Sequence, residues 1–393
     1  MTSRMRTRCA STSRLRVARR RPSCSPTSPP RASPSGTCLE LRGRLSATGS
    51  TNRCLQIFRR GSWCSAARAK SCSRFLDATS TASIATWPTI WRGASPLRSM
   101  QRTRAGRAAW IAGKAVLPAI DASGNGRIAA LASRSPERAG AMLSAYREAR
   151  LCDSYEQLIE QRDVDAVYIP LVNNLHLEWT LRALDAGKHV LCEKPLGMNA
   201  VEAEEMAAAA DRAGKRLMEA FMYRFDPRMR DFVEGLHDPL HVNATFGFHL
   251  RAPEDYRFQA SLGGGALLDV GCYVASVSRW IMGEPIDVMA AARMQGGVDL
   301  TTTALLAFDG GRSASLWCSF ESPEEQEVTV IARDGVHRRD RPFNLLDDPI
   351  GPYRLMVESF ADSVLNDRPI AIPLAESIAN MKTLDRIREA ARF

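Results

Sequence analysis

The sequence predicts an α/β fold: a doubly wound parallel sheet, followed by an α+β domain with an open, mostly antiparallel sheet. Between residues 111 and 222, short apolar segments alternate with helical segments. Such alternation is typical of right-handed βαβ units. After residue 223 the segments become β-rich, with polar and apolar residues in alternation. This second pattern predicts an antiparallel sheet that leaves one face uncovered.

The elements of the parallel sheet are bounded by residues that favour helix ends. Strands are expected at 127–132, 164–169, 189–192 and 217–221, and a first helix at 111–120. Later helices begin at capping residues: Ser135 before a proline, and the pairs Ser154/Gln157 and Asn199/Glu202. Gly187 and Gly214 follow the last helical residues, where glycine commonly ends a helix.

The second half is expected to supply one sheet and three helices. The expected strands are 241–250, 288–294, 301–308, 313–320 and 327–332. A glycine-rich stretch from Gly263 to Tyr273 leads into a helix that runs through Trp280, and helices are expected at 353–365 and 374–391.

Charge divides the 393 residues into two unlike parts. Residues 1–110 contain 22 Lys or Arg and two acidic residues, whereas residues 111–393 contain 31 and 41. The net charge of +10 is therefore an average of a basic and an acidic part. No apolar run approaches the roughly 18 residues of a membrane span, so we expect no membrane segment.

Residues 1–110 are rich in Arg, Ser and Pro and show no sustained helical or strand period. A nucleic-acid-binding arm and a transit peptide are both compatible with this composition. We favour a third interpretation, in which a shifted reading frame or a wrongly assigned start produced the segment. In each case we expect disorder, because apolar residues are too sparse to offset the entropy of ordering the chain.

The ten cysteines show no CxxC and no Cys/His metal spacing, and six of them lie in residues 1–110. A disulfide framework is typical of small secreted domains. We therefore expect a reduced, cytoplasmic protein without a metal site.

The segment His189–Pro195 is the strongest functional signal. Its apolar residues form one short buried strand, and Lys194 follows at the carboxyl end. Ligands of open parallel sheets bind in the crevice at the carboxyl ends of the strands. Lys194 is therefore a candidate site residue.

Several motifs together resemble the Gfo/Idh/MocA family of NAD(P)-dependent oxidoreductases, over residues 111–393. The Glu193-Lys194-Pro195 turn is nearly the family's signature, and the Gly263–Tyr273 stretch has its Gly-Gly-Gly-x-x-x-Asp pattern. The segments 219–225 and 269–273 resemble the branch of sugar (xylose, glucose–fructose) and dihydrodiol dehydrogenases. The resemblance implies a Rossmann-type domain at 111–222 and a substrate and oligomerisation domain at 223–393.

Two departures from the family pattern affect this interpretation. The family begins with a strand and a G-x-G-x-x-G/A turn that holds the pyrophosphate at a helix N-terminus. Arg107 and Ala109 occupy the positions of two of those glycines, and the residues before them are no buried strand. The chain is thus expected to lack the usual first strand and the phosphate loop. Asp226 stands where this branch usually has His.

The resemblance implies that Lys194, Asp269 and Tyr273 are catalytic. Lys194 would orient the substrate hydroxyl and stabilise an alkoxide, and Tyr273 would act as general acid or base. A phenol titrates near 10, so a neighbouring Lys194 is expected to stabilise the phenolate. Each residue also has an ordinary structural interpretation: a solvated lysine, a helix cap or a core tyrosine.

Cofactor-binding residues are expected along the carboxyl ends of the strands. Ser133 and Arg134 end the second strand, where an arginine suits the 2′-phosphate of NADP, and Arg138 could take the same role. NAD is the alternative cofactor. The resemblance adds further residues around the nicotinamide: Pro170, Asn174, His176, Glu193, Lys194, Pro195 and Arg224.

These expectations define an NADP-dependent oxidoreductase that moves hydride between nicotinamide and a hydroxyl of a sugar, polyol or cyclic diol. A non-catalytic dinucleotide-binding protein and an inactive truncated or frameshifted homologue are the alternatives. The expected partners are a small-molecule substrate and further copies of the chain, as a dimer or tetramer. Neither nucleic acid nor a membrane is expected.

Overall fold

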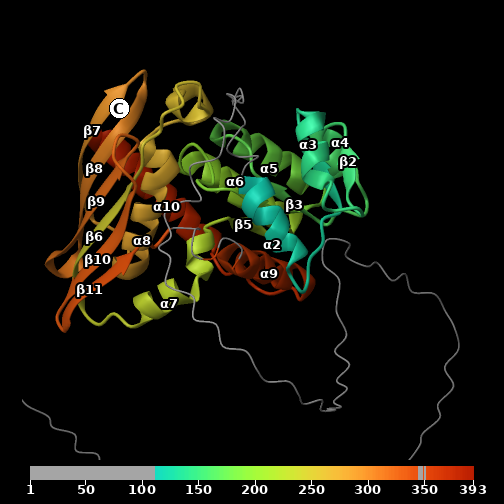
Figure 1. Cartoon of the computed structure of the whole chain (residues 1–393). Coiled ribbons are helices and arrows are strands. Elements are labelled where there is room, and N and C mark those ends of the chain that lie inside the picture. The colour runs from blue at the N-terminus through green and yellow to red at the C-terminus, as the bar shows by residue number, and fades with distance from the viewer. Residues whose placement is uncertain (1–110, 344–347, 349–350) are drawn as a thin grey trace, which may run out of the picture. The chain divides into compact units, whose positions relative to one another are not determined.

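The computed structural model describes residues 111–343, 348 and 351–393, all within one compact unit of the chain. The expectations for residues 1–110, including their disorder, lie outside these ranges. The predicted fold class is confirmed, with parallel strands in the first part and a separate, mostly antiparallel sheet in the second (Figure 1).

The first part contains five short strands and the helices between them. In chain order its elements are η1 (Ala112–Val116), α2 (Leu117–Asp121), β1 (Ala130–Ala132), α3 (Pro136–Leu143), β2 (Arg150–Cys152), α4 (Tyr155–Glu160), β3 (Ala166–Ile169), η2 (Asn173–Leu175), α5 (His176–Asp185), β4 (His189–Cys192), α6 (Ala200–Ala213) and β5 (Leu217–Glu219). Strand β2 was not predicted, because only Cys152 of its three residues is buried.

The predicted helix caps are confirmed. The side chains of Ser135, Ser154 and Asn199 accept hydrogen bonds from backbone N–H groups three residues further on, at 3.4, 3.1 and 3.0 Å. Gly187 and Gly214 have φ of +75° and +61°, a backbone region that favours glycine. The sequence therefore fixes the ends of the helices that lead into the site.

The parallel sheet is divided into two pieces. β1 pairs with β2, and β3, β4 and β5 pair in that order, all in parallel. Among the described residues, no strand joins β1 to β3. The expected absence of the family's first strand concerns residues before 111, which lie outside the described ranges.

The second part contains helices η3 (Met222–Phe225) and α7 (Pro227–Glu234) before its sheet. The remaining elements are β6 (Pro239–Gly247), η4 (Tyr256–Phe258), η5 (Ala260–Leu262), η6 (Leu267–Gly271), α8 (Cys272–Met282), β7 (Asp287–Gln295), β8 (Val298–Phe308), η7 (Asp309–Gly311), β9 (Arg312–Ser319), β10 (Glu325–Ala332), β11 (Gly335–Asp340), α9 (Gly351–Leu365) and α10 (Leu374–Ala391). The sequence predicted neither α7 nor β11.

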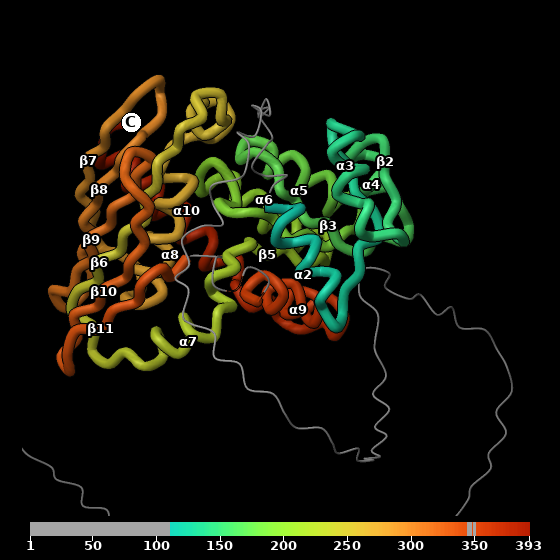
Figure 2. The backbone as a smooth tube through the Cα atoms, viewed as in Figure 1, coloured from blue at the N-terminus to red at the C-terminus, as the bar shows by residue number. Residues whose placement is uncertain are grey.

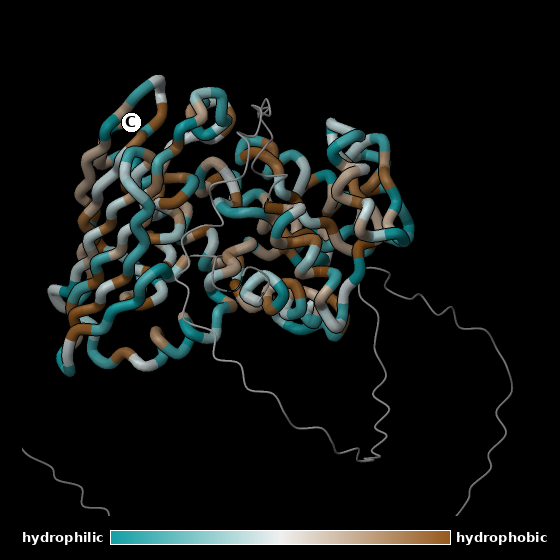
Figure 3. The backbone as a smooth tube through the Cα atoms, viewed as in Figure 1, coloured by the Kyte–Doolittle hydropathy of each residue, from teal (hydrophilic) through white to brown (hydrophobic). Residues whose placement is uncertain are grey.

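The six strands form one sheet in the order β11-β10-β6-β9-β8-β7. Only β6 and β9 pair in parallel; the other neighbours are antiparallel. Helices α8 and α10 contact the sheet on one face, and Figure 2 shows both beside it. The hydropathy along these strands changes repeatedly, as Figure 3 shows.

The other face of this sheet carries exposed apolar side chains. Met289 on β7 lies opposite Leu305 on β8, and these residues are 60% and 39% exposed. Ile331 on β10 lies opposite Val336 on β11, and they are 43% and 53% exposed. This face is open, as the alternating pattern predicted.

One helical stretch, Ala260–Met282, has the length and hydropathy of a membrane span, contrary to the expectation from the sequence. However, 72% of its apolar window is buried inside the molecule. Val274, Ala275 and Val277 of α8 are each 1% exposed or less. These values are those of a core helix.

Candidate active site

The turn after β4 places Lys194 against the start of the helical segment η6. The ammonium of Lys194 donates to the backbone oxygen of Asp269 at 2.7 Å and to its carboxylate Oδ1 at 3.1 Å. The two side chains are only 10% and 12% exposed. Burial acts to lower the pKa of Lys194, but the carboxylate of Asp269 outweighs it and raises that pKa. The amine is therefore a fixed, permanent cation at the carboxyl end of the parallel strands.

A buried arginine that the sequence analysis missed completes this charge cluster. Arg257, 2% exposed, bonds through Nη1 to Oδ2 of Asp269 at 3.0 Å and through Nε to Oδ1 of Asp255 at 2.9 Å. Asp269 is thus shared between two cations. The only sequence signal was the Asp-x-Arg spacing in a loop, which is too common to indicate a site.

Glycines and a buried carboxylate fix the loop before Asp269. Gly265 has φ of +114°, and a side chain at this position would collide with Asp299. Asp299 accepts hydrogen bonds from the backbone N–H of Leu267 at 2.8 Å and from the hydroxyl of Thr302 at 2.7 Å. The glycine-rich motif therefore allows a close approach of the loop to β8, which sets the position of Asp269.

Tyr273 lies beside Lys194, but the contact differs from the predicted one. The ammonium of Lys194 lies 4.9 Å from the centroid of the Tyr273 ring, so it faces the π surface. Burial first, and the nearby carboxylate of Glu193 second, raise the pKa of Tyr273 well above its ordinary value. The predicted stabilisation of a phenolate by Lys194 is thus not what this geometry provides. The site instead favours a neutral phenol that can donate a proton.

Two buried side chains, His176 and Glu219, contact the backbone just after Lys194. His176, 0% exposed, places Nδ1 2.9 Å from the carbonyl oxygen of Pro195 and Nε2 3.1 Å from that of Leu171. Burial lowers the pKa of His176, which favours a neutral ring with one donor. Glu219 accepts the backbone N–H of Leu196 at 2.9 Å. His176 was expected near the nicotinamide. In the structure both of its ring nitrogens instead lie against backbone carbonyl oxygens, those of Pro195 and Leu171.

Glu219 makes stability depend on pH. Burial raises its pKa to about 7 from an ordinary value near 4.5. Between these values the folded protein keeps a proton that the unfolded chain releases, so stability falls as pH rises. At about 1.4 kcal/mol per pKa unit, the loss across this window is roughly 3 kcal/mol.

We expect Glu219→Gln to remove this dependence of the free energy of unfolding on pH. The amide oxygen still accepts the hydrogen bond from the backbone N–H of Leu196, and the amide does not titrate. Urea unfolding at pH 4.5 and pH 7.5 measures it, with Glu204→Gln on an exposed helix surface as control. An unchanged difference between the two pH values in Glu219→Gln would assign the slope to other groups.

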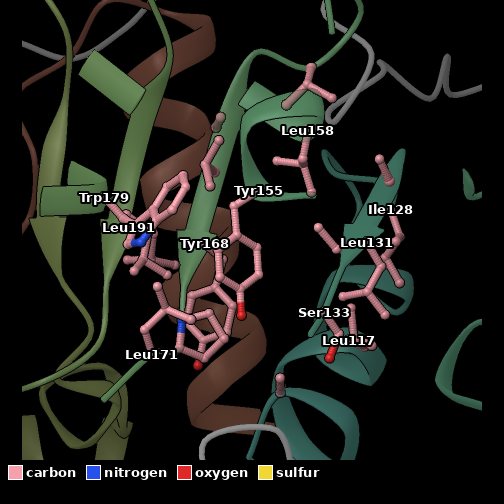
Figure 4. Close-up of a pocket in the computed structure, with 18 of the residues that line it drawn as sticks. Leu117, Ile128, Leu131, Ser133, Tyr155, Leu158, Tyr168, Leu171, Trp179 and Leu191 are labelled. Atoms are coloured by element: carbon pink, nitrogen blue, oxygen red, sulfur yellow. The ribbon is translucent and has the colours of Figure 1, made fainter. Parts of the chain in front are cut away.

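Four of the expected cofactor residues lie apart from Lys194. Ser133, Arg134, Arg138 and Pro170 line a cavity of about 660 Å³ between β1 and β3 (Figure 4). Lys194, Asp269 and Tyr273 are not in its lining. The described structure therefore has a charged centre and a separate, mainly apolar cavity.

Three other expected residues differ in their surroundings. Asn174, on η2, has a buried side-chain oxygen without a hydrogen-bond partner in the part of the chain that the structure describes, and a ligand amide or hydroxyl could satisfy it. Glu193 accepts from the hydroxyl of Tyr168 at 2.6 Å and lies next to Lys194. Arg224 instead pairs with Glu376 at 3.0 Å and stacks on Trp280 at 4.1 Å, so it joins α8 to α10.

Asp226, which stands where this branch of the family usually has His, has a structural partner in Arg228. Its carboxylate caps α7 by accepting from the backbone N–H of Arg228 at 2.9 Å, and it also forms an ion pair with that side chain. Burial opposes this charge, but the bonds to Arg228 lower the pKa of Asp226 overall. The residue is explained as a helix cap.

The described chain thus has two parts, one of parallel strands with helices and one built on a mostly antiparallel sheet. Residues 105–221 match the model of an oxidoreductase family with an NAD-binding Rossmann fold, and residues 235–338 match the C-terminal domain of the same family. The chain belongs to this GFO/IDH/MocA family. The predicted family resemblance is confirmed.

Relatives include enzymes that act on hydroxyl and keto groups. The chain is 37% identical to D-xylose 1-dehydrogenase (NADP(+)) 2 of Haloferax volcanii, over 72% of the chain and 95% of that protein. It is 31% identical to trans-1,2-dihydrobenzene-1,2-diol dehydrogenase of Xenopus tropicalis, over 58% and 70%. A 3-ketoreductase from Actinomadura kijaniata, solved with NADP and TDP-benzene, is 28% identical with a TM-score of 0.65, over 72% and 95%.

Proposed function

We propose that the protein is an NADP-dependent oxidoreductase that transfers hydride between nicotinamide and a hydroxyl or keto group of a sugar, polyol or cyclic diol. The observation that carries the proposal is the buried ammonium of Lys194, held by Asp269 and placed on the ring of Tyr273. The relatives named for xylose and dihydrodiol oxidation support the substrate class.

The residues present fit the two ends of a dinucleotide. Ser133 and Arg134 lie at the carboxyl end of β1, where an arginine suits a 2′-phosphate. Asn174, which the family resemblance assigns to the nicotinamide end, has a buried side-chain oxygen without a partner among the described residues. A bound nicotinamide supplies or accepts the hydride.

In this proposal the charged centre handles the substrate oxygen. Lys194 holds that oxygen and stabilises negative charge on it, because a preorganised cation in a water-poor site acts strongly on developing charge. Asp269 and Arg257 keep the ammonium in place. Tyr273 donates the proton during reduction of a carbonyl and takes it back during oxidation.

Tyr273→Phe tests the proton transfer. We expect kcat to fall at least tenfold, because general acid–base assistance is worth roughly 10²–10⁴-fold. The measurement is NADP⁺ reduction with D-xylose and with a trans-dihydrodiol as the hydroxyl substrates. Tyr223→Phe is the matched control, since the hydroxyl of Tyr223 donates to Ser276 at 2.7 Å within the same aromatic cluster. A loss below tenfold in Tyr273→Phe would contradict the role.

The alternative function is binding without turnover, or an inactive homologue. The division of the sheet between β1 and β3 favours it, together with Arg107 and Ala109 at the glycine positions. Hydride transfer by the full 393-residue chain would exclude this alternative.

The open sheet face supports self-association as a dimer or tetramer, with residues 111–222 binding cofactor and residues 223–393 binding substrate. Exposed Met289, Leu305, Ile331 and Val336 would be covered in such an assembly. The cytoplasmic location is part of the same proposal, supported by four buried free cysteines.

A further inference from the structure

The ammonium of Lys194 donates two of its three N–H groups to a single residue. They bond to the backbone oxygen of Asp269 at 2.7 Å and to its carboxylate Oδ1 at 3.1 Å. In the part of the chain that the structure describes, the third N–H has no acceptor, so it is available to a substrate oxygen. Because the nitrogen is tetrahedral, two fixed donors also fix the direction of the third. Whatever holds the Asp269 carboxylate therefore decides where Lys194 can donate.

Arg257 holds the second oxygen of that carboxylate. Its Nη1 donates to Oδ2 of Asp269 at 3.0 Å. On the other side of the guanidinium, Nε and Nη2 donate to the two oxygens of Asp255, both at 2.9 Å. Such a two-bond contact fixes the plane of a guanidinium as well as its position. One rigid group thus joins two carboxylates, and the side chain of Asp269 cannot turn without losing its bond to Arg257.

The surroundings of Arg257 keep this contact in one geometry. The guanidinium is 2% exposed and its partner Asp255 is 12% exposed. It lies 5.3 and 5.7 Å from the ring centroids of Phe248 and Phe320. Burial acts to lower the pKa of Arg257, but the carboxylates of Asp269 and Asp255 raise it overall. The cation is therefore permanent, and little water competes for its hydrogen bonds.

The backbone of Arg257 holds the glycine-rich loop that leads to Asp269. Its carbonyl oxygen accepts a hydrogen bond from the N–H of Gly265 at 2.9 Å. The carbonyl oxygen of Gly265 in turn accepts from the N–H of Asp269 at 3.2 Å. A side chain at Gly264 would place its Cβ 2.5 Å from the carbonyl oxygen of Arg257. Glycine at position 264 is therefore required for this approach, and Arg257 contacts both the loop and the carboxylate that the loop presents.

We propose that Asp255 and Arg257 are positioning residues for the reaction. Together they fix the orientation of the Asp269 carboxylate and, through it, the direction in which Lys194 donates to the substrate oxygen. They act through Asp269 and not on the substrate. The catalytic consequence rests on the proposed function, whereas the positioning of the ammonium can be measured without cofactor or substrate.

NMR of the lysine ammonium groups measures the positioning directly. The chain contains six lysines, so labelling with [15Nζ]lysine gives few signals, and Lys194→Met identifies that of Lys194. We expect Arg257→Met to speed exchange of the Lys194 ammonium protons with water at least tenfold, because the freed Asp269 carboxylate turns away. Arg257→Lys keeps the charge without the planar fork and should have a smaller effect.

Gly264→Ala tests the same contact without a change of charge. Its Cβ displaces the backbone of Arg257, so exchange at Lys194 should again be at least tenfold faster. Gly124→Ala is the matched control, since a Cβ at position 124 meets nothing within 4 Å. If Arg257→Met does not fold, Gly264→Ala and Arg257→Lys decide the question.

A second buried arginine separates positioning from a general loss of stability. Arg279 is 8% exposed, and its Nε and Nη1 bond to Glu284 and to the backbone oxygen of Glu376 at 3.0 and 3.1 Å. Arg279→Met should lower the urea midpoint of unfolding as Arg257→Met does, yet leave exchange at Lys194 within twofold of the unaltered chain. Equal acceleration in both variants, or none in Arg257→Met, would overturn the proposal.

Reduction of NADP⁺ with D-xylose by the full chain measures the catalytic consequence. We expect kcat to fall at least tenfold in Arg257→Met, with the KM for NADP⁺ changed less than threefold. Faster ammonium exchange with an unchanged kcat would overturn the catalytic part of the proposal. Absence of hydride transfer by the unaltered chain would count against the proposed function alone, since the exchange measurement still decides whether Arg257 positions Lys194.

Discussion

Replacing residues 1–110 by an apolar strand and a Gly-x-Gly-x-x-Ala turn is expected to lower the Kd for NADPH at least a hundredfold. The strand would fill the cavity between β1 and β3, and the turn would present backbone N–H groups to the pyrophosphate at the start of η1. A hydrogen bond to a charged group contributes about 1.5–3 kcal/mol. Two such bonds therefore account for about two to four factors of ten in affinity.

Fluorescence titration of NADPH against both chains measures this effect. The matched control carries the same new strand but keeps Arg and Ala at the two glycine positions, as at Arg107 and Ala109. The control should regain stability without regaining affinity, which separates the strand from the phosphate-binding turn. Equal affinity of the original chain and of the chain with the replaced N-terminus would mean that residues 1–110 already supply a phosphate site.

In the chain with the replaced N-terminus, the affinity for NADPH can be compared with the affinity for NADH. Arg134 lies at the carboxyl end of β1, in the lining of the same cavity. If this arginine binds a 2′-phosphate, Arg134→Ala weakens NADPH binding and leaves NADH binding nearly unchanged. The comparison tests the cofactor assignment separately from the missing turn.

Local signals in the sequence predicted most of the fold. Ser135 and Asn199 cap helices in the structure. Each side-chain oxygen accepts a hydrogen bond from the backbone N–H three residues further on, which has no partner within the helix. This contact is local and does not depend on the rest of the fold. The strand at His189–Cys192 was predictable because it is apolar and bounded by Gly187 and Pro195. Strand β11, with only two half-buried residues, has no apolar pattern to indicate it.

The candidate site was predictable only in part, because its geometry depends on long-range contacts. Lys194 and Asp269 were expected as site residues, and the structure brings them together across 75 positions of the chain. The bond from Arg257 to Asp269 depends on how the η4 loop folds back, which no local pattern encodes. The pKa of Tyr273 depends on burial among aromatic rings contributed by Phe221, Phe246 and Phe343. From the sequence, Lys194 was expected to dominate that pKa.

Lys194→Met is expected to reduce kcat by roughly 10²–10³-fold, since loss of one preorganised donor to a developing oxyanion has this effect. The fold should persist, because the carboxylate of Asp269 keeps its bond to Arg257 at 3.0 Å and is not left as an unpaired buried charge. Methionine is unbranched and one atom shorter than lysine, so it fills most of the same space without the charge. The loss is therefore assigned to the missing cation.

The assay uses the chain with the replaced N-terminus, so that cofactor binding does not limit the rate. Lys382→Met is the matched control: Lys382 is 57% exposed, and its ion pair with Glu204 lies on the helix surface. A fall in kcat with unchanged Kd for NADPH would show that the cation acts on the substrate oxygen. If Lys194→Met instead raised that Kd and kept kcat within tenfold, the ammonium would serve cofactor binding, and Tyr273 would have to act without it.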